Sequence, residues 1–223
     1  MPSNTYPIIA REGWLPAGLL ILLLVIAVYL HGITVTLITA ALLLVFLFLV
    51  RDPIQDVPSS PLAIVSPVHG RIVADNEVED DWIKRPARQL ILQMSPFDIY
   101  SLRSPIEGKV VNQWTRKPDG QHSNRLFAFR VRGDEGDEVV VVIHLNMLTA
   151  ALFRFYVHSG ERLGHGQRCG FLYLGGRIEV LLPLNCRLRV RPGERIASGS
   201  GVLANLVHKN GASVIQDGQT AGS

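Results

Sequence analysis

A long apolar segment near the N-terminus constrains the fold of this chain more than any other feature. The residues from Leu15 to Val50 include no Asp, Glu, Lys or Arg, and Arg11, Glu12 and Arg51 flank them. A membrane-spanning helix needs about 20 consecutive apolar residues, and this segment is much longer. We therefore expect a membrane-embedded part joined to a water-soluble part.

Two arrangements of this segment are possible, one long tilted helix or two short helices that turn at His31 and Gly32. The turn is favoured because a polar residue followed by Gly interrupts a helix. A hairpin places Arg11 and Arg51 on the same side of the membrane, and cationic flanks favour the cytoplasm. No small-residue cleavage site precedes Arg51, so the segment is expected to remain in the mature protein. We predict a protein of the cell inner membrane with a cytoplasmic globular domain.

Composition divides the chain into five parts. Residues 1–14 form an N-terminal segment and residues 15–50 the membrane-embedded helical hairpin. Residues 51–61, RDPIQDVPSSP, are rich in Pro and Ser and are expected to form an extended linker. Residues 62–208 are long enough for one sizeable core. Residues 209–223 are polar and Gly-rich and are expected to form a flexible tail.

Short strand-like runs dominate the globular part. They alternate apolar and polar residues or are rich in β-branched residues, and Gly, Pro or Asp separates them. Only the stretch from Asn146 to Phe155 has the apolar spacing of a short helix. The strand-like runs include RIVAD, RQLILQM, GKVVNQW, RLFAFRVR, EVVVVIHL, CGFLYL, RIEVLLP and CRLRVR. The pattern predicts a mainly β fold.

Two motifs occur twice in this part. SPVHGRIVA at Ser66 is echoed by SPIEGKVVN at Ser104, and VHSGERLGHGQ at Val157 by VRPGERIASGS at Val190. The first motif predicts a turn followed by a strand, and the second predicts a strand, a turn and a strand. Two copies at unequal intervals favour duplicated β units over a solenoid. We predict a compact barrel-like or sandwich-like β fold with internal quasi-symmetry.

The charge of the chain indicates which partners it can bind, and the positions of its cysteines indicate whether a disulfide forms. The formal net charge is +3, and the densest basic cluster is KRPAR, Lys84 to Arg88. Basic residues beside an anchor suit anionic membrane phospholipid, although a solvated loop is the simpler interpretation of this cluster. No basic stripe with interleaved aromatics is present, so nucleic-acid binding is not expected. Cys169 and Cys186 lie in apolar runs without CxxC spacing, which predicts free thiols rather than a disulfide.

No metal site is expected. Five histidines lack metal-ligand spacing with carboxylates or cysteines, which favours solvated or core histidines. They are His122, His144, His158, His165 and His208.

The order of the motifs resembles that of a known family. Around the double-length apolar stretch, the chain carries REGW at Arg11, RDP at Arg51, SPVHG at Ser66, MSPFDIYSLRSPIEG at Met94, GQRCGFLYLGGRIEVLLP at Gly166 and VRPGERIASGSGVLANL at Val190. From about Tyr6 to Leu206 it is similar to short-form bacterial phosphatidylserine decarboxylase proenzymes. The resemblance implies the fold of that family and a tendency to associate.

The resemblance also implies a particular chemistry. In this family the proenzyme cuts itself at a Gly-Ser bond in an FGSRVD stretch, and the new N-terminal Ser becomes a pyruvoyl group. That carbonyl forms a Schiff base with phosphatidylserine and accepts electrons during loss of CO2, which leaves phosphatidylethanolamine. A His oriented by an Asp activates the Ser. The first step requires a hydroxyl group, because an N-to-O acyl shift needs an oxygen nucleophile.

The present chain departs from the family at all three catalytic positions. The stretch LGGRIE places Gly175 before the former cleavage bond and Gly176 at the position of the Ser. The motif SPVHG places His69 at the position of the Asp, and MSPFDIY places Tyr100 at the position of the His. The resemblance therefore implies a chain without an intact catalytic site, without self-cleavage and without the pyruvoyl cofactor. A hydrogen bond between His69 and Tyr100, across Gly176, is a further hypothesis.

A smaller departure agrees with this interpretation, and the alternative cleavage bond in the chain is poorly placed. The family's ARR motif aligns with Ala150, Ala151 and Leu152, and Arg154 nearby is either a substitute cation or, as we favour, a surface residue. A Gly-Ser bond survives at Gly199, but it lies past the family's cleavage segment. A cut there would release a tail of only 24 residues, Ser200 through Ser223.

Three functions are compatible with the sequence. The favoured one is a membrane-anchored, catalytically inactive relative of phosphatidylserine decarboxylase that binds lipid or regulates phospholipid metabolism. The second is an active decarboxylase that obtains its carbonyl group by an unrecognised route. The third is a scaffold that pairs with itself as a homo-oligomer or with an active paralogue.

Overall fold

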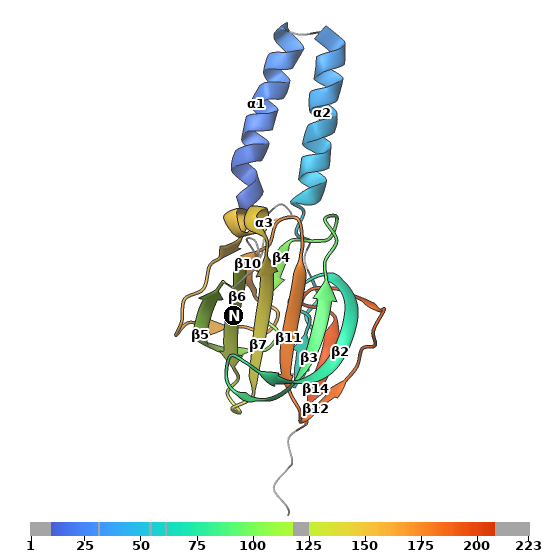
Figure 1. Cartoon of the computed structure of the whole chain (residues 1–223). Helices are drawn as coiled ribbons and strands as arrows, with labels where there is room; N and C mark the ends of the chain where they lie inside the picture. Colours follow the sequence, from blue (N-terminus) through green and yellow to red (C-terminus); the bar gives the residue numbers. More distant parts are fainter. Residues whose placement is uncertain (1–9, 31, 54, 61, 118–124, 208–223) are drawn as a thin grey trace, which may run out of the picture.

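Two apolar helices stand on one end of a β domain (Figure 1). The computed structural model describes residues 10–207 apart from 31, 54, 61 and 118–124. A short 3-10 turn, η1 (Arg11–Gly13), leads into α1 (Trp14–Leu30), and α2 (Gly32–Leu49) returns to the same end of the domain. The break between α1 and α2 lies at the predicted turn. The expected flexible tail, His122 and His208 lie outside the described residues.

Both helices present apolar side chains to their surroundings. Only Ala17 and Ala27 of α1 and Thr39 of α2 are buried among the described residues of the hairpin. By length and composition α2 is able to cross a membrane, and α1 is an apolar helix one residue shorter. At 1.5 Å per residue each helix is about 26 to 27 Å long. The pair thus has the dimensions of a bilayer hairpin.

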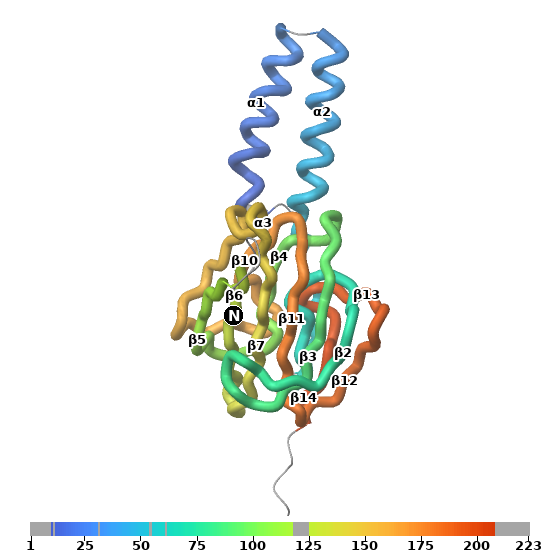
Figure 2. Tube along the Cα trace, in the orientation of Figure 1, coloured from blue at the N-terminus to red at the C-terminus, as the bar shows by residue number. Residues whose placement is uncertain are grey.

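In the part of the chain that is described, fourteen strands form three antiparallel sheets. The largest has the order β13-β2-β3-β11-β7-β6-β5-β9 and curls around the core (Figure 2). Two three-stranded sheets, β1-β14-β12 and β4-β10-β8, complete the domain. The strands are β1 (Ala63–Val65), β2 (Gly70–Asp80), β3 (Arg85–Gln93), β4 (Ser101–Arg103), β5 (Gly108–Arg116), β6 (Arg125–Arg132), β7 (Glu138–Leu145), β8 (Arg154–Phe155), β9 (Arg162–Leu163), β10 (Arg168–Phe171), β11 (Arg177–Pro183), β12 (Cys186–Leu188), β13 (Arg195–Ile196) and β14 (Val202–Leu206). The predicted mainly β fold with an N-terminal helical pair is confirmed.

Alternation along the strands of the large sheet creates two apolar clusters. On β7 and β11, Val141, Ile143 and Ile178 belong to the main core. Their strand neighbours Val140 and Val142 belong to a second cluster. Successive side chains of a strand point to opposite faces, so a strand with both faces covered reads as a continuous apolar run. The run EVVVVIHL in β7 has this origin.

The predicted duplication is visible in the backbone. The Ser66 and Ser104 hydroxyl groups each donate to the carbonyl oxygen two residues later, at 2.7 Å in both cases. The Gly193 N–H donates to the Ile72 carbonyl, and the Gly160 N–H to the Val110 carbonyl, again at 2.7 Å in both cases. Each motif pair therefore builds the same turn and the same short strand contact twice.

The two units also hold each other reciprocally. The Val65 N–H donates to the Pro105 carbonyl, and the Arg103 N–H donates to the Pro67 carbonyl, both at 2.9 Å. Such an exchange is expected of two similar units related by an approximate twofold axis. The two copies of the SPxxG motif are therefore in direct contact with each other.

The helix expected over Asn146–Phe155 is shorter than predicted. Asn146 caps α3 (Met147–Leu152) by accepting a hydrogen bond from the Thr149 N–H at 2.8 Å. Phe155 instead pairs with β10 as part of β8 and lies 4.9 Å from Phe129, centroid to centroid. The periodicity missed this change because contacts with distant aromatic residues override local helix propensity.

The segment after α2, expected to be an extended linker over residues 51–61, packs against the domain where it is described. Asp52 is fully buried, with its carboxylate 3.2 Å from Arg103. Gln55 accepts a hydrogen bond from the Ser200 hydroxyl at 3.2 Å. The hairpin is therefore joined to the β domain by a packed connection.

Candidate functional site

The loop between β10 and β11 carries Gly175 and Gly176, where the motif alignment places the family's cleavage bond. Leu174, Gly175 and Gly176 have φ angles of +65°, +71° and +156°, in a region that residues with a side chain rarely adopt. A Cβ at Gly175 would lie 3.0 Å from both the Met94 Cβ and the Ser95 carbonyl oxygen. A Cβ at Gly176 would lie 3.3 Å from the His144 carbonyl oxygen. The loop conformation requires glycine at 175 and disfavours a serine at 176.

Tyr100 is packed beside this loop. Its side chain is buried and stacks edge-on against Phe171, with ring centroids 5.8 Å apart. The Tyr100 carbonyl oxygen accepts a hydrogen bond from the Leu172 N–H at 2.8 Å, and the Tyr100 phenol donates to the Pro96 carbonyl oxygen. Burial raises the pKa of the phenol above its ordinary value. Tyr100 is therefore a neutral donor at physiological pH and does not act as a base.

His69 lies on the other side of the same region, half-buried. Its Nδ1 accepts a hydrogen bond from the Ser198 N–H at 3.1 Å, so the ring proton is assigned to Nε2. Burial lowers the pKa of the imidazole, and the positive charges of Arg103 and Arg51 act in the same direction. His69 is thus a neutral imidazole whose Nδ1 is already engaged.

The structure brings the three altered positions into one region without joining their side chains. Ser198 bridges two of them, since its N–H reaches His69 and its hydroxyl lies 3.4 Å from the Ser101 carbonyl oxygen, next to Tyr100. Among the described residues, no hydrogen bond joins His69 to Tyr100, because each bonds a backbone group instead. The hypothesis of a direct His–Tyr hydrogen bond is therefore wrong.

A pocket of about 280 Å³ lies beside this region, where β2, β13 and the end of β3 meet. Arg71 and Arg195 are directly opposite each other in the β2–β13 pairing and supply two guanidinium groups. Asp98 also lines the pocket, and its carboxylate accepts a hydrogen bond from the Ser95 N–H at 2.6 Å. Arg groups suit phosphate oxygens. The pocket is lined by Gly70, Arg71, Val73, Gln93, Met94, Ser95, Asp98 and Arg195.

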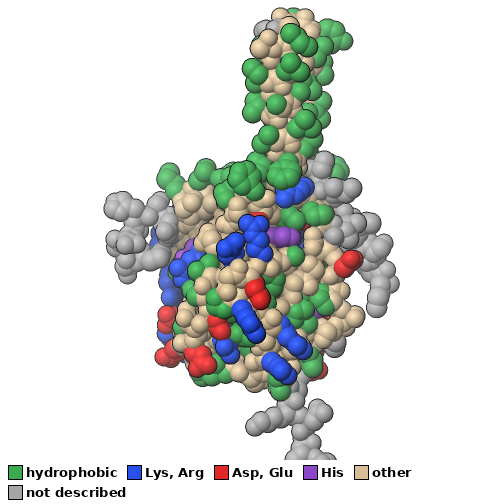
Figure 3. Space-filling model, turned by 90° about the vertical axis from the view of Figure 1, so that its right-hand side faces the viewer, with side chains coloured by type: hydrophobic (Ala, Val, Ile, Leu, Met, Phe, Trp, Pro, Cys, Tyr) green, Lys and Arg blue, Asp and Glu red, His purple; other side chains and the backbone are tan. Residues whose placement is uncertain are grey.

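Sequence reasoning missed this pocket. The available signal was that both arginines lie in echoed motifs, Arg71 in HGRIV and Arg195 in GERIA. Figure 3 shows several Lys and Arg side chains on one side of the domain below the hairpin. The pocket borders the β3–β4 loop, and the Phe97 carbonyl oxygen of this loop accepts a hydrogen bond from Arg51 directly after α2, so the pocket lies near the connection to the hairpin.

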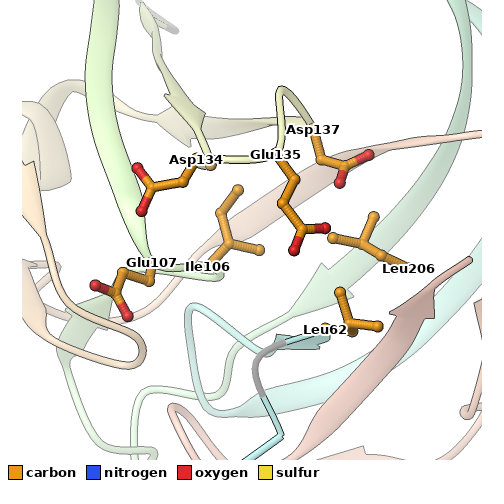
Figure 4. A pocket seen from close by; sticks show the side chains of 8 residues that line it. Leu62, Ile106, Glu107, Asp134, Glu135, Asp137 and Leu206 are labelled. Carbon is orange, nitrogen blue, oxygen red and sulfur yellow. The ribbon is translucent and has the colours of Figure 1, made fainter. Parts of the chain in front are cut away.

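The duplicated unit has a second pocket of opposite character. Glu107 of SPIEG holds the position that His69 has in SPVHG, and its pocket measures about 140 Å³. Figure 4 shows the acidic side chains of Glu107, Asp134, Glu135 and Asp137 around it, together with Leu62, Ile106 and Leu206. Arg162 pairs with Glu107 at 3.4 Å and with Asp134. Carboxylates repel a phosphate group, so this pocket is not suited to a phospholipid headgroup.

A further polar cluster that sequence reasoning missed lies on β3, β7 and β11. His144 Nε2 is 2.7 Å from Glu179 Oε1, and Gln89 donates to Glu179 Oε2 at 2.7 Å. Burial raises the pKa of Glu179, but the hydrogen bond and charge of His144, with contributions from Arg177 and Gln89, lower it overall. Within the described residues, no group of three His, Cys, Asp or Glu side chains is placed to hold a metal ion.

The remaining residues singled out in the sequence have structural contacts. Arg154 donates to the Ala151 and Phe153 carbonyl oxygens at 3.1 and 3.0 Å, at the C-terminal end of α3. Cys169 and Cys186 are both free, which confirms the predicted absence of a disulfide between them. In the basic cluster, Arg88 is paired with Asp75 at 2.7 Å and Lys84 is exposed.

Comparison with known proteins is consistent with the motif order. The family model for phosphatidylserine decarboxylase matches residues 42–204. The chain is 34% identical over 217 residues to a phosphatidylserine decarboxylase proenzyme of Nitrosomonas europaea, covering 92% of this chain and 98% of the relative. It is 32% identical over 217 residues to the proenzyme of Aromatoleum aromaticum, covering 92% and 99%. No solved structure matches the chain significantly.

Proposed function

Because the chain belongs to the phosphatidylserine decarboxylase family, we propose that it is a membrane-anchored member that neither cuts itself nor forms a pyruvoyl group. In this proposal it binds phospholipid headgroups as an inactive or regulatory protein of phospholipid metabolism, with its domain on the cytoplasmic face of the inner membrane. The observation that carries the proposal is the glycine at position 176, in a backbone conformation that disfavours a side chain.

The chemistry of the family has no starting group here. Self-cleavage needs a hydroxyl on Cβ as nucleophile, and the later elimination needs a leaving group on the same atom; Gly176 has no Cβ. Activation of a nucleophile also needs a base within reach. The Tyr100 phenol is a donor with a raised pKa, and the Nδ1 atom of His69 is engaged by Ser198. The residues present do not fit a pyruvoyl group.

The pocket beside His69 supports a retained lipid-binding role. Arg71 and Arg195 supply positive charge to this pocket next to the β3–β4 loop, whereas the duplicated pocket around Glu107 is acidic. A phosphodiester headgroup is therefore the ligand that the first pocket suits and the second does not.

Intact-mass analysis tests the loss of self-cleavage. We expect the purified chain at its full mass of 24.6 kDa, and the Nitrosomonas europaea proenzyme purified in parallel serves as a positive control for processing. The Gly176→Ser variant is expected to remain uncut, since it restores the nucleophile without a base. Two fragments from the wild-type chain, one carrying a pyruvoyl mass, would show an active decarboxylase and overturn the proposal.

Ligand-induced thermal shift tests the lipid-binding role. We expect glycerophosphoserine to raise the melting temperature of the full chain in nanodiscs and to have little effect on an Arg71→Gln/Arg195→Gln variant. The matched control is Arg162→Gln, which removes a guanidinium at the acidic pocket. The absence of any shift in the wild-type chain would favour a scaffold that acts as a homo-oligomer or with an active paralogue.

A further inference from the structure

The end of the β domain next to the hairpin exposes apolar side chains from three segments that are distant in the sequence. They are Phe97 in the β3–β4 loop, Leu174 in the β10–β11 loop, and Met147, Leu148 and Leu152 of α3. Met147 is 77% exposed, Phe97 68% and Leu148 58%. We call these five residues the apolar rim. Side chains of this size seldom remain exposed together on a surface that faces only water.

The apolar rim surrounds the base of the hairpin. Figures 1 and 2 show α3 beside the start of α1 and the loop after β3 beside the end of α2. The Phe97 carbonyl oxygen accepts a hydrogen bond from Arg51 at 3.2 Å, directly after α2. The β10–β11 loop, which contains Leu174, packs against the start of the β3–β4 loop, because a Cβ added at Gly175 would lie 3.0 Å from the Met94 Cβ. Figure 3 shows hydrophobic side chains across this end of the domain, continuous with the hairpin.

We propose that the apolar rim lies in the interfacial layer of the same bilayer that holds the hairpin, so that α3 and the Phe97 and Leu174 loops act as additional membrane contacts. This inference rests on the membrane anchoring in the proposed function. It adds a second contact surface, formed by the β domain itself, with a lipid surface as the partner.

The connection between hairpin and domain is too tight to hold this end away from the membrane. Ala10 and Val50, which flank the hairpin, are buried, and the Ala10 N–H donates to the Val50 carbonyl at 3.0 Å. Glu12 is 2.5 Å from Arg168, a residue of the domain. Helices of about 27 Å are slightly shorter than a hydrocarbon core of about 30 Å, which draws the domain toward the headgroups.

The residues that border the apolar rim have the chemistry of the membrane interface. The Arg51 guanidinium lies 3.8 Å over the Phe48 ring, at the end of α2. Arg154 is exposed at the end of α3, and Trp14 begins α1 with 60% of its side chain exposed. Arg side chains reach headgroups from helix ends, and Trp residues concentrate at the interface. A lipid surface therefore fits this end better than a second protein does.

Site-directed fluorescence on the full chain tests the inference. A Cys186→Ser background removes the half-buried thiol, and Cys169 stays unreactive because it is fully buried and burial raises its pKa. An NBD label is placed at Met147→Cys or Phe97→Cys. The control is Leu184→Cys, which is 49% exposed in the turn between β11 and β12. The protein is reconstituted into vesicles of phosphatidylcholine and phosphatidylglycerol that contain a shallow doxyl-lipid quencher.

We expect the doxyl lipid to quench the labels at 147 and 97 several times more strongly than the label at 184, and iodide in the buffer to show the opposite order. Flotation of the same vesicles reports on the hairpin separately. If the vesicles carried the protein in flotation but iodide quenched all three labels equally, the apolar rim would not be a membrane contact, whereas the hairpin would still be the anchor. Labels at 147 and 97 that are shielded from both quenchers would also overturn it, in favour of a second copy of the chain. Failure to float would overturn the anchor and the rim together.

Discussion

Replacing Asp52 by Asn should weaken the junction between hairpin and domain more than any substitution on the surface. Asp52 is fully buried and lies 3.2 Å from Arg103 and 3.5 Å from Arg168. Both arginine side chains are themselves almost fully buried, at 6% and 5% exposure. The substitution keeps the shape of the side chain and removes a negative charge that contacts both cations.

The magnitude follows from the burial of the partners. Removing one member of a buried ion pair costs about 3–5 kcal/mol, because the remaining charge stays desolvated without compensation. Arg168 retains Glu12 at 2.5 Å, so Arg103 bears most of the loss. For a domain of this size, the cost corresponds to a fall in melting temperature of about 6–20 °C.

Thermal unfolding of the full chain in nanodiscs, followed by near-UV circular dichroism, measures this change. The matched control is Asp81→Asn, which breaks an exposed pair with Lys84 and should change the stability by no more than about 0.5 kcal/mol. An Asp52→Asn/Arg103→Met double variant should recover part of the loss, since it no longer buries an unpaired cation at position 103. If Asp52→Asn melted together with the Asp81→Asn control, the reasoning about the buried ion pairs would be refuted.

Two further predictions concern the β10–β11 loop and the polar cluster on β3, β7 and β11. Gly175→Ala should lower the free energy of unfolding by about 1–3 kcal/mol, because the new side chain strains the backbone and crowds Met94. Chemical denaturation should show a smaller loss for the control Gly136→Ala, because Gly136 also has a positive φ angle but a Cβ there would meet no neighbouring atom. An equal loss in both variants would mean that crowding at Met94 contributes nothing. The pKa of Glu179 is lowered overall from an ordinary value of 4.5, so its stabilising contribution is present above that pH and is lost as the pH falls through the lower folded-state pKa. Urea midpoints measured from neutral pH to about pH 3 should therefore fall less steeply for Glu179→Gln than for the wild-type chain, and parallel curves would contradict this assignment.

Local sequence pattern was sufficient for the architecture. The charge-free segment with a Gly after His31 predicts two apolar helices, because helix formation and its interruption depend on neighbouring residues. The echoed SPxxG and GER motifs predict the duplicated units, because a turn is specified by a few adjacent residues. The helix after Asn146 was predicted too long, since Phe155 is held by aromatic partners on other strands.

The candidate site could be predicted only in part. Alignment of motifs located Gly176, Tyr100 and His69, because each position is defined by its own short stretch of sequence. It did not reveal that Tyr100 bonds to Pro96 or that His69 bonds to Ser198. Those partners depend on how β4, β10 and the turn before β14 are brought together. The same holds for Arg71 and Arg195, which are far apart in the chain and opposite each other in the sheet.

The sequence by itself determined that this is a β protein with an apolar hairpin and with a glycine, which has no hydroxyl group, at position 176, because these properties belong to single residues or short segments. Only the tertiary structure decided which side chains the altered residues contact, where two arginines form a pocket, and that Phe97, Leu174 and α3 surround the base of the hairpin. Those features arise from contacts between distant segments, and such contacts depend on the packing of the whole domain.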